Sequence, residues 1–128
     1  MKNILTFLLL IFFGLTKAQE DSQFIKTYTL YAEIKDGEFG EIYTTNVTFI
    51  FNYGPHNDVK MYNNNTGEDS LYTKVSPIRS GKRNDGTEYQ YLTVLSDRGV
   101  EIELVLYDDN ELRLYIGTGT YGFVFYEQ

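Results

Sequence analysis

Apolar and polar side chains alternate with a period of two along most of this 128-residue chain, and short turn sequences interrupt the alternation. In one segment Val100, Ile102 and Leu104 occupy the even positions, whereas Glu101 and Glu103 occupy odd ones. Successive side chains of a β-strand point to opposite faces, so this alternation predicts strands with one apolar and one polar face. The pattern therefore favours an all-β fold.

The alternation occurs in about eight segments. They span residues 24–34, 42–53, 58–62, 70–75, 89–95, 100–107, 111–116 and 121–126. Turn formers such as Asp36-Gly37 and Gly54-Pro55 separate them, because glycine reaches positive φ and proline cannot donate to a sheet ladder. Short connections place consecutive strands side by side and antiparallel, as in a meander.

One flat sheet of this size would leave an apolar face in water, so we expect the sheet to close on itself or to fold over. We predict a single antiparallel meander of about eight strands closed as a small β-barrel, with a β-sandwich as the alternative. The barrel is favoured because only residues 76–87 form a long connection. An outer-membrane barrel is disfavoured because its strands need about 9–11 residues, and segments 58–62 and 70–75 are shorter.

The first 18 residues show a different pattern. Lys2 precedes an apolar run from Ile4 to Leu15, and Thr16-Lys17-Ala18 places small residues before Gln19. This order is typical of a cleaved secretory signal peptide, and the run is shorter than the roughly 20 residues of a membrane-spanning helix. We therefore expect residues 1–18 to be removed and residues 19–128 to form one all-β domain without a transmembrane segment. The protein is then exported to the periplasm or the exterior.

The sequence contains no cysteine, which excludes disulfide bonds, thiol catalysis and a cysteine-built zinc site. Small secreted domains of eukaryotes usually carry disulfides, so a bacterial exported protein fits better. Removing residues 1–18 takes away two lysines and leaves 9 basic residues against 18 acidic ones, a net charge of −9. A chain of this charge repels nucleic acid, and we expect no nucleic-acid partner.

The residues that ordinarily carry catalysis are scarce. His56 is the only histidine, and it lies in a Gly-Pro-His-Asn turn without a serine motif nearby. Glu101 and Glu103 share a strand face that we interpret as solvated, so a glycoside hydrolase-like enzyme is the least favoured alternative. The acidic turns near Asp36 and Asp108 lack the spaced pattern of a calcium loop. The sequence thus predicts a non-enzymatic protein with no catalytic residue, cofactor or metal site.

Basic residues gather around the segment 76–87. Lys74, Arg79, Lys82 and Arg83 are four of the nine cations that follow residue 18. On an acidic chain, a local positive group suits a small anionic ligand or an acidic partner surface. We therefore predict that these residues bind such a partner, with a solvated hairpin loop as the alternative.

The chain holds 12 tyrosines, which give stiff, amphipathic contact area when they lie on a surface. If the valine, leucine and phenylalanine rows face inward, a second set of binding residues lies on the opposite face, and cross-strand packing is the alternative role. The residues expected there are Tyr31, Tyr62, Tyr72, Tyr107, Tyr115 and Tyr126. Those expected to line an internal cavity, if one exists, are Tyr28, Tyr43, Tyr53, Tyr89 and Tyr91.

The sequence therefore predicts a binding protein of the bacterial cell envelope or exterior, whose partner is a protein, a glycan or a small anionic ligand. A lipocalin-like carrier of a small molecule is the alternative. Inward phenylalanines argue against the carrier, because Phe49, Phe51, Phe123 and Phe125 would fill a narrow interior. A carrier needs a cavity of about 300 Å³ or more.

Overall fold

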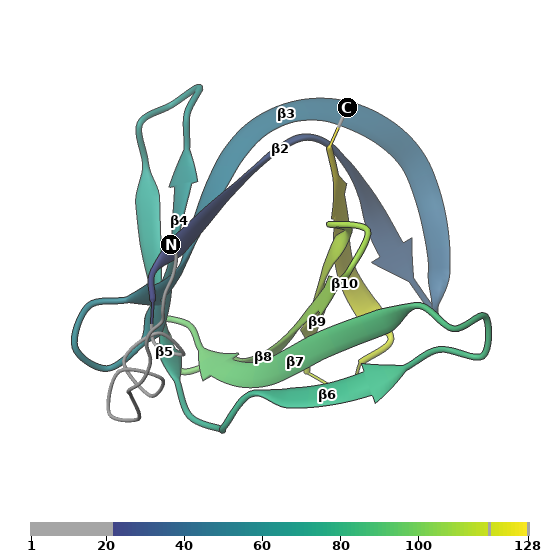
Figure 1. Cartoon of the computed structure of the whole chain (residues 1–128). Helices are drawn as coiled ribbons and strands as arrows, with labels where there is room; N and C mark the ends of the chain where they lie inside the picture. Colours follow the sequence, from purple (N-terminus) through teal and green to yellow (C-terminus); the bar gives the residue numbers. More distant parts are fainter. Residues whose placement is uncertain (1–21, 118, 128) are drawn as a thin grey trace, which may run out of the picture.

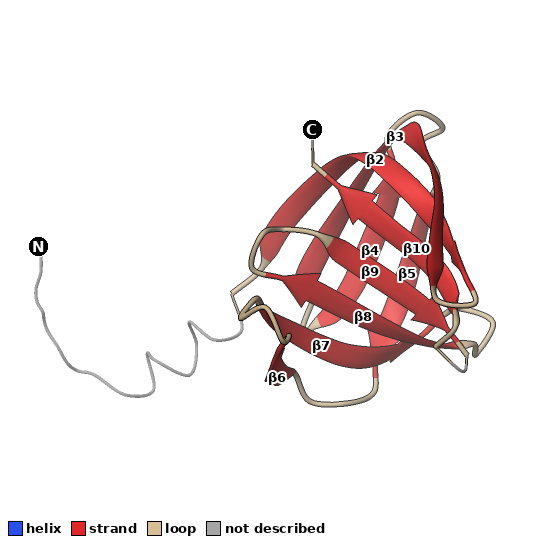
Figure 2. Ribbon diagram, turned by 90° about the vertical axis from the view of Figure 1, so that its right-hand side faces the viewer, coloured by secondary structure: helices blue, strands red, loops and turns tan. Residues whose placement is uncertain are grey.

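The computed structural model describes residues 22–117 and 119–127. Strands account for 67% of these residues and none is helical, so the predicted all-β class is confirmed (Figure 2). The predicted signal peptide at residues 1–18 lies outside the described residues. Within the described ranges, no helix is long and apolar enough to cross a membrane.

Nine strands make up one sheet. In chain order they are β2 (Phe24–Lys35), β3 (Glu38–Tyr53), β4 (Asp58–Asn63), β5 (Asp69–Lys74), β6 (Arg79–Lys82), β7 (Glu88–Leu95), β8 (Glu101–Tyr107), β9 (Leu112–Ile116) and β10 (Tyr121–Tyr126). All the pairings are antiparallel, as the short turns predict.

The strands are arranged as a hydrogen-bonded ring (Figure 1). The first strand, β2, pairs with the last, β10, and the sheet continues as β5-β4-β3-β2-β10-β9-β8-β7-β6. A short pairing of β5 with β7, Thr73 with Leu95 and Lys74 with Val94, joins the two ends of this order. The predicted meander is confirmed in that most consecutive strands are neighbours, but β5 is followed in the ring by β7 rather than β6.

Strand β6 lies in the segment that the sequence pattern assigns to a loop. Residues Arg79–Lys82 pair with the first half of β7, and Arg83 N–H donates to Thr87 O at 2.8 Å to close the hairpin. Gly86, at φ 93°, supplies the positive φ of this turn. The strand was missed because its Arg-Ser-Gly-Lys sequence has no apolar alternation, which an edge strand outside the core does not need.

Aromatic and aliphatic side chains fill the middle of the ring. Tyr28, Phe49 and Leu112 are fully buried, and Leu104 is 1% exposed. The Phe49 ring packs edge-on against Tyr28 at 6.0 Å and against Phe125 at 5.4 Å between ring centroids. This cluster is the principal core, and its phenylalanines occupy the centre as the sequence predicts.

Strand β2 contributes side chains to two buried clusters, one on each face of the sheet. Register shifts lie between Tyr28 and Leu30 and between Ala32 and Ile34. At both shifts the extra residue lies in β3, because two steps along β2 correspond to three along β3. Tyr28 packs in the principal core, whereas Ala32 and Ile34 join Val124, the partner of Ala32 on β10, in a second buried cluster on the other side of the sheet.

In β5 the faces are opposite to those that its sequence indicates. Tyr72 was expected on the outer face, opposite an inward leucine row, but Leu71 is 42% exposed. Tyr72 instead packs against the principal core, because it lies directly opposite the buried Val59 of β4. Residues directly opposite each other in an antiparallel pair share a face. The pairing partner, rather than the apolar residues of β5 itself, decides the side.

Tyr28 carries an unusual polar group for its position. The ring is fully buried, and its hydroxyl oxygen has no hydrogen-bond partner among the described atoms. Burial raises the pKa of this hydroxyl well above its usual value near 10, and the negative charges of Glu127 and Asp109 add to the effect. A buried hydroxyl without a partner costs roughly 1–3 kcal/mol.

Tyr28→Phe is expected to raise the free energy of unfolding by about 1 kcal/mol near neutral pH, because it removes the unpaired hydroxyl and keeps the ring. In the unfolded chain Tyr28 ionises near pH 10, whereas the folded protein holds the proton to higher pH. Wild-type stability therefore falls as pH rises above about 10, and the variant lacks this contribution. Urea denaturation at about pH 7 and pH 11 measures both effects. A variant less stable than wild type by about 1 kcal/mol would reveal a partner for the hydroxyl.

Candidate functional site

The ring is packed in its middle and hollow towards both ends. At one end lies a pocket of about 440 Å³, here named the Lys74 pocket. Beside it, and sharing Gln90 and Leu106, lies a hollow of about 620 Å³, the Lys26 hollow. The Tyr31 pocket, about 330 Å³, lies towards the other end, where β8 contributes Ile102 instead of Leu106. Each volume exceeds the roughly 300 Å³ of a small ligand pocket.

The Lys74 pocket combines an apolar wall with a few polar groups. The apolar residues are Phe24, Phe51, Val59, Pro77, Ile78, Leu92 and Leu106, and the polar ones are Asn52, Asn57, Lys74 and Gln90. Binding sites for small molecules typically have this composition, in which apolar contact supplies area and a few polar groups fix orientation. We therefore treat this pocket as the candidate site.

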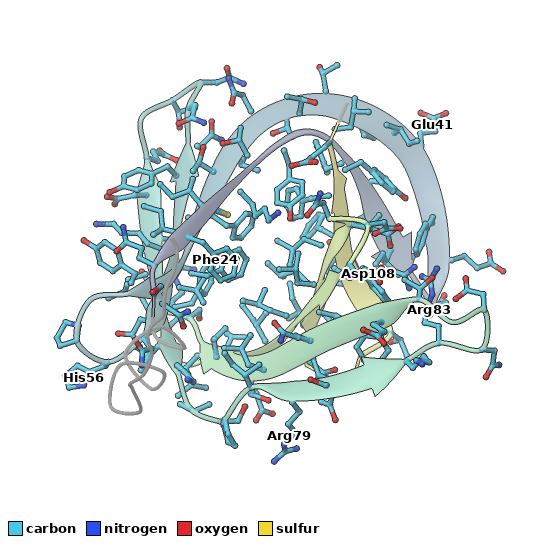
Figure 3. The ribbon with its side chains drawn as sticks, viewed as in Figure 1. Phe24, Glu41, His56, Arg79, Arg83 and Asp108 are labelled. Carbon is cyan, nitrogen blue, oxygen red and sulfur yellow. The ribbon has the colours of Figure 1, made fainter. Side chains whose placement is uncertain are left out.

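Phe24 and Phe51 form one flat wall of the pocket. They lie directly opposite each other in the β2–β3 register, and their rings stack with centroids 4.8 Å apart and planes 17° apart. Phe51 continues into the core through Phe49, at 6.2 Å between centroids. Figure 3 shows Phe24 pointing into the ring. The wall is thus held from behind, while Phe24 remains 38% exposed to a ligand.

Lys74 points into the ring from the end of β5. It pairs with Val94, which is fully buried in the principal core, and directly opposed side chains share a face. Tyr72, two residues earlier, packs against the same core. The backbone N–H of Lys74 donates to Asp58 Oδ1 at 2.9 Å, which fixes the backbone from which the side chain extends.

The segment after Lys74 covers one side of the pocket. Val75 N–H donates to Thr93 O at 3.0 Å, and Thr93 N–H donates to Ser76 Oγ at 2.8 Å. These bonds extend the β5–β7 contact and bring Pro77 and Ile78 to the pocket wall. Ile78 remains 43% exposed, so the pocket is accessible to solvent along this segment.

Asparagines shape the turn on the opposite side of the pocket. Asn52 and Asn57 have φ values of 57° and 59°, in the left-handed region that asparagine tolerates better than most residues. The turn between them reverses the chain from β3 to β4 and brings both residues to the pocket. Asn52 Nδ2 donates to Ser22 O at 3.0 Å, and both asparagines contribute polar surface to the pocket lining.

The Lys26 hollow is larger, but its charges already have partners. Lys82 Nζ lies 3.7 Å from Glu88 Oε2, and Lys26 Nζ donates to Asn110 Oδ1. Asp108 adds a second carboxylate. Both lysines of this lining are therefore already paired with other side chains, so they are less available to a ligand than Lys74 is.

The Tyr31 pocket contains two of the predicted binding residues, Tyr31 and Tyr72. Both pack against the principal core, so they lie on the inner face and not on the outer face predicted for them. Tyr31 lies directly opposite Phe125 of the principal core, and Tyr72 lies directly opposite Val59, so each shares the inner face of its partner. Burial, together with the charge of Asp97, raises the pKa of the Tyr72 hydroxyl.

The four cations of the predicted basic site do not gather in one place. Lys74 lines its pocket, Lys82 lines the Lys26 hollow, and Arg79 points away from the ring (Figure 3). Arg83 lies 3.1 Å from Asp85, whose pKa is lowered to about 2 by the N–H of Thr87 and by this guanidinium. The single positive surface that their spacing predicts is therefore divided among four environments.

The outer tyrosines of the predicted face are largely covered. The guanidinium carbons of Arg83 and Arg113 lie 4.7 Å from the ring centroid of Tyr107, which is only 7% exposed. Tyr115 and Tyr126 pack against the second core cluster. Tyr62 lies beneath Lys60, whose Nζ is 5.3 Å from its ring centroid. These contacts favour the cross-strand packing role for this face.

The tyrosines predicted to line a cavity have mostly other environments. Tyr28 is buried in the core, and Tyr43 is 52% exposed. Tyr53 contacts Lys60, with its ring centroid 5.0 Å from Nζ. Tyr89 lines the Lys26 hollow and packs against Tyr91 and Tyr107. The apolar wall of the Lys74 pocket is built from phenylalanine, proline and aliphatic residues instead.

The residues considered for catalysis lie apart from these hollows. Glu101 and Glu103 are exposed on β8, at the solvated positions that the sequence pattern indicates for them. His56 points away from the ring (Figure 3). In residues 22–117 and 119–127, no group of three histidine, cysteine or carboxylate side chains is placed to hold a metal ion.

Comparison of the chain with models of protein families, with curated proteins and with solved structures finds no match. The geometry of the pockets is therefore the observation that bears on function. Among them, the Lys74 pocket alone combines a mainly apolar lining with an inward-pointing cation.

Most of the Lys74 pocket was missed at the sequence level. Only Lys74 was among the predicted binding residues; Phe24 and Phe51 read as ordinary strand residues, and Gln90 carried no signal. The sequence does contain one clue to the pocket. Lys74 lies two residues after Tyr72 on β5, so the two side chains take the same face of the strand. The sequence does not show that this face points inward, because the pairing of β5 with β4 decides it.

Proposed function

We propose that this protein is a non-enzymatic carrier that binds a small, mainly apolar molecule in the Lys74 pocket. The observation that supports the proposal most directly is the pocket's volume of about 440 Å³ together with its stacked wall of Phe24 and Phe51. At the sequence level, the inward phenylalanines argue against a carrier because they would fill the interior. They do fill the middle of the ring, but this end remains hollow. Export, as the N-terminal sequence predicts, places the carrier outside the cytoplasm.

We further propose that the ring is a closed small β-barrel. The pairing of β2 with β10 and the contact of β5 with β7 support closure over a sandwich, because a sandwich separates two sheets. Val75 N–H, bonded to Thr93 O, lengthens the β5–β7 contact. A barrel of about eight strands is wide enough to hold one small ligand.

A binding role through the outer face has less support. Tyr107 and Tyr115 are engaged with arginines and with the second core cluster, and the predicted cations are dispersed. An interface needs a contiguous patch of available side chains. The carrier reading, the alternative at the sequence level, is therefore favoured over the interaction surface.

The proposal is tested with N-phenyl-1-naphthylamine, a neutral dye that fluoresces in apolar surroundings. We expect the purified protein to bind it saturably, with about one dye per chain. Ile78→Glu should weaken binding at least about tenfold, because it places a carboxylate at the apolar wall. Ile78 is 43% exposed, so the fold is expected to survive the change.

The matched control is Leu71→Glu. Leu71 is 42% exposed, like Ile78, but it lies outside the Lys74 pocket and opposite Lys60. This variant should bind the dye as wild type does. Absence of saturable binding, or equal weakening in both variants, would overturn the carrier proposal.

A further inference from the structure

Lys74 is a half-buried cation whose Nζ has no side-chain partner among residues 22–117 and 119–127. In the part of the chain that the structure describes, the other half-buried cations each contact a polar or charged side chain. The pairs are Lys26 with Asn110, Lys60 with Asp69, Arg83 with Asp85 and Arg113 with Glu111. Among the described residues, no side chain accepts a hydrogen bond from Lys74 Nζ, and no carboxylate oxygen lies within 4.0 Å of it.

An inward lysine is costly unless something compensates its charge, because withdrawal from water disfavours the ammonium group. The surrounding sheet offers no such compensation. Lys74 shares its face with the core residues Val94 and Tyr72, and Asp58 is engaged with the backbone N–H of Lys74. An anion from outside the chain would supply the charged partner that the described residues do not.

The rest of the pocket restricts that anion to one charge. Lys74 is the only ionisable residue in the lining, and the other polar residues are the neutral amides Asn52, Asn57 and Gln90. A dianion would leave one negative charge uncompensated, and a cation would be repelled. The amide N–H groups can donate to the second oxygen of a carboxylate.

The remainder of the ligand must be apolar. Phe24 and Phe51 present a stacked wall, and Leu92 and Leu106 lie on the strands opposite. The volume of about 440 Å³ equals about 15 water molecules at roughly 30 Å³ each, which is the size of a small organic acid.

We propose that the ligand of the Lys74 pocket is an amphipathic monoanion, with its carboxylate or similar group on Lys74 Nζ and its apolar body against Phe24 and Phe51. This inference rests on the carrier function proposed above and adds the chemical class of the ligand. The chain is acidic overall, with a formal charge of −7 for the full sequence. Its general field therefore repels anions, and the attraction must be local to Lys74.

The test compares octanoate with 1-octanol and octylamine, which share the chain length and differ in the charge of the head group. Each is titrated as a competitor of N-phenyl-1-naphthylamine at low salt. For wild type we expect octanoate to bind at least about tenfold more tightly than octanol, and octylamine to bind most weakly. Lys74→Met, which keeps the side-chain length and removes the charge, should abolish the preference and leave octanol affinity within about twofold.

Two controls distinguish an effect of Lys74 itself from an effect of the overall positive charge at this end of the ring. Lys82→Met removes a nearby cation that is already paired with Glu88, and it should retain the preference for octanoate. Lys74→Arg keeps the charge and should retain the preference as well. If Lys82→Met loses the preference as Lys74→Met does, or if Lys74→Arg loses it, the assignment to Lys74 is overturned.

The outcomes also distinguish this inference from the function on which it rests. Equal binding of octanoate and octanol to wild type would leave the carrier function standing and overturn the monoanion. Stronger binding of octylamine would do the same. Failure of the neutral dye to bind at all would overturn both proposals. Circular dichroism confirms in each case that Lys74→Met retains the β fold.

Discussion

Phe49→Ala is expected to lower the free energy of unfolding by about 4 kcal/mol, because it removes a fully buried ring and leaves a cavity. Phe49 contacts three other aromatic rings, those of Tyr28, Phe51 and Phe125, at centroid distances of 6.0, 6.2 and 5.4 Å. These residues come from β2, β3 and β10, so the cavity would weaken the junction at which the first and last strands meet. Urea denaturation and the melting temperature measure the loss, which corresponds to roughly 15–30 °C for a domain of this size.

The control for Phe49→Ala is Phe39→Ala, which deletes the same atoms from a ring that is 44% exposed. Phe39 contacts the guanidinium of Arg113, 4.9 Å from its centroid, and such a contact is worth about 0.5–1 kcal/mol. Phe39→Ala should therefore cost less than about 1.5 kcal/mol in all. Similar losses in both variants would mean that the centre of the ring is not the principal core.

The sequence pattern predicts strands well where both neighbours of a strand are regular. In β8 the alternation places Ile102 and Leu104 inward and Glu101 and Glu103 outward, and the structure agrees. β7 and β9 pair with β8 without a register shift, so the period-two rule holds along its whole length. Regular segments of this kind are the reason that the all-β class, the antiparallel pairing and most of the turns can be predicted from the sequence.

The pattern is less informative where pairing overrides the residues of a single strand. Along β2, Tyr28 packs in the principal core but Ala32 and Ile34 pack in the second cluster, and nothing in the alternating sequence marks where the buried face changes. In β5, pairing with β4 turns Tyr72 inward and Leu71 outward against their hydrophobicity. These features depend on contacts between strands, which a single sequence does not display.

The candidate site shows the same division. Local charge led to Lys74, but the reason for its importance is its inward direction on β5, which only the pairing establishes. The wall opposite comes from Phe24 at the start of β2 and Phe51 near the end of β3, residues that meet because these strands pair antiparallel over their length. The pocket forms because the strand order brings together residues that are far apart in the sequence. The type of each residue alone does not indicate that it lines a pocket.

Gly122→Ala is expected to destabilise the protein by about 3 kcal/mol or more, because β10 passes too close to β9 for a side chain at this position. A Cβ atom on Gly122 would overlap the carbonyl oxygen of Leu114, and it would lie 2.9 Å from the carbonyl carbon and 3.0 Å from Tyr115 Cα. These are backbone atoms, so no side-chain rotation relieves the overlap. The residue belongs to the string Gly117-x-Gly119-x-x-Gly122, which resembles a dinucleotide fingerprint by spacing alone and here joins two strands.

Gly40→Ala is the matched control for Gly122→Ala, since it also lies in a strand and its added Cβ would find its nearest neighbour, Glu33 O, at an ordinary 3.5 Å. Alanine restricts the unfolded chain more than glycine does, so this variant should be stabilised by up to about 1 kcal/mol. Thermal and urea denaturation of both variants measure the contrast. Since β10 connects β2 to β9, a forced separation at Gly122 opens the ring at its closing strand. A Gly122→Ala protein as stable as Gly40→Ala would show that β9 and β10 lie farther apart there than this structure places them.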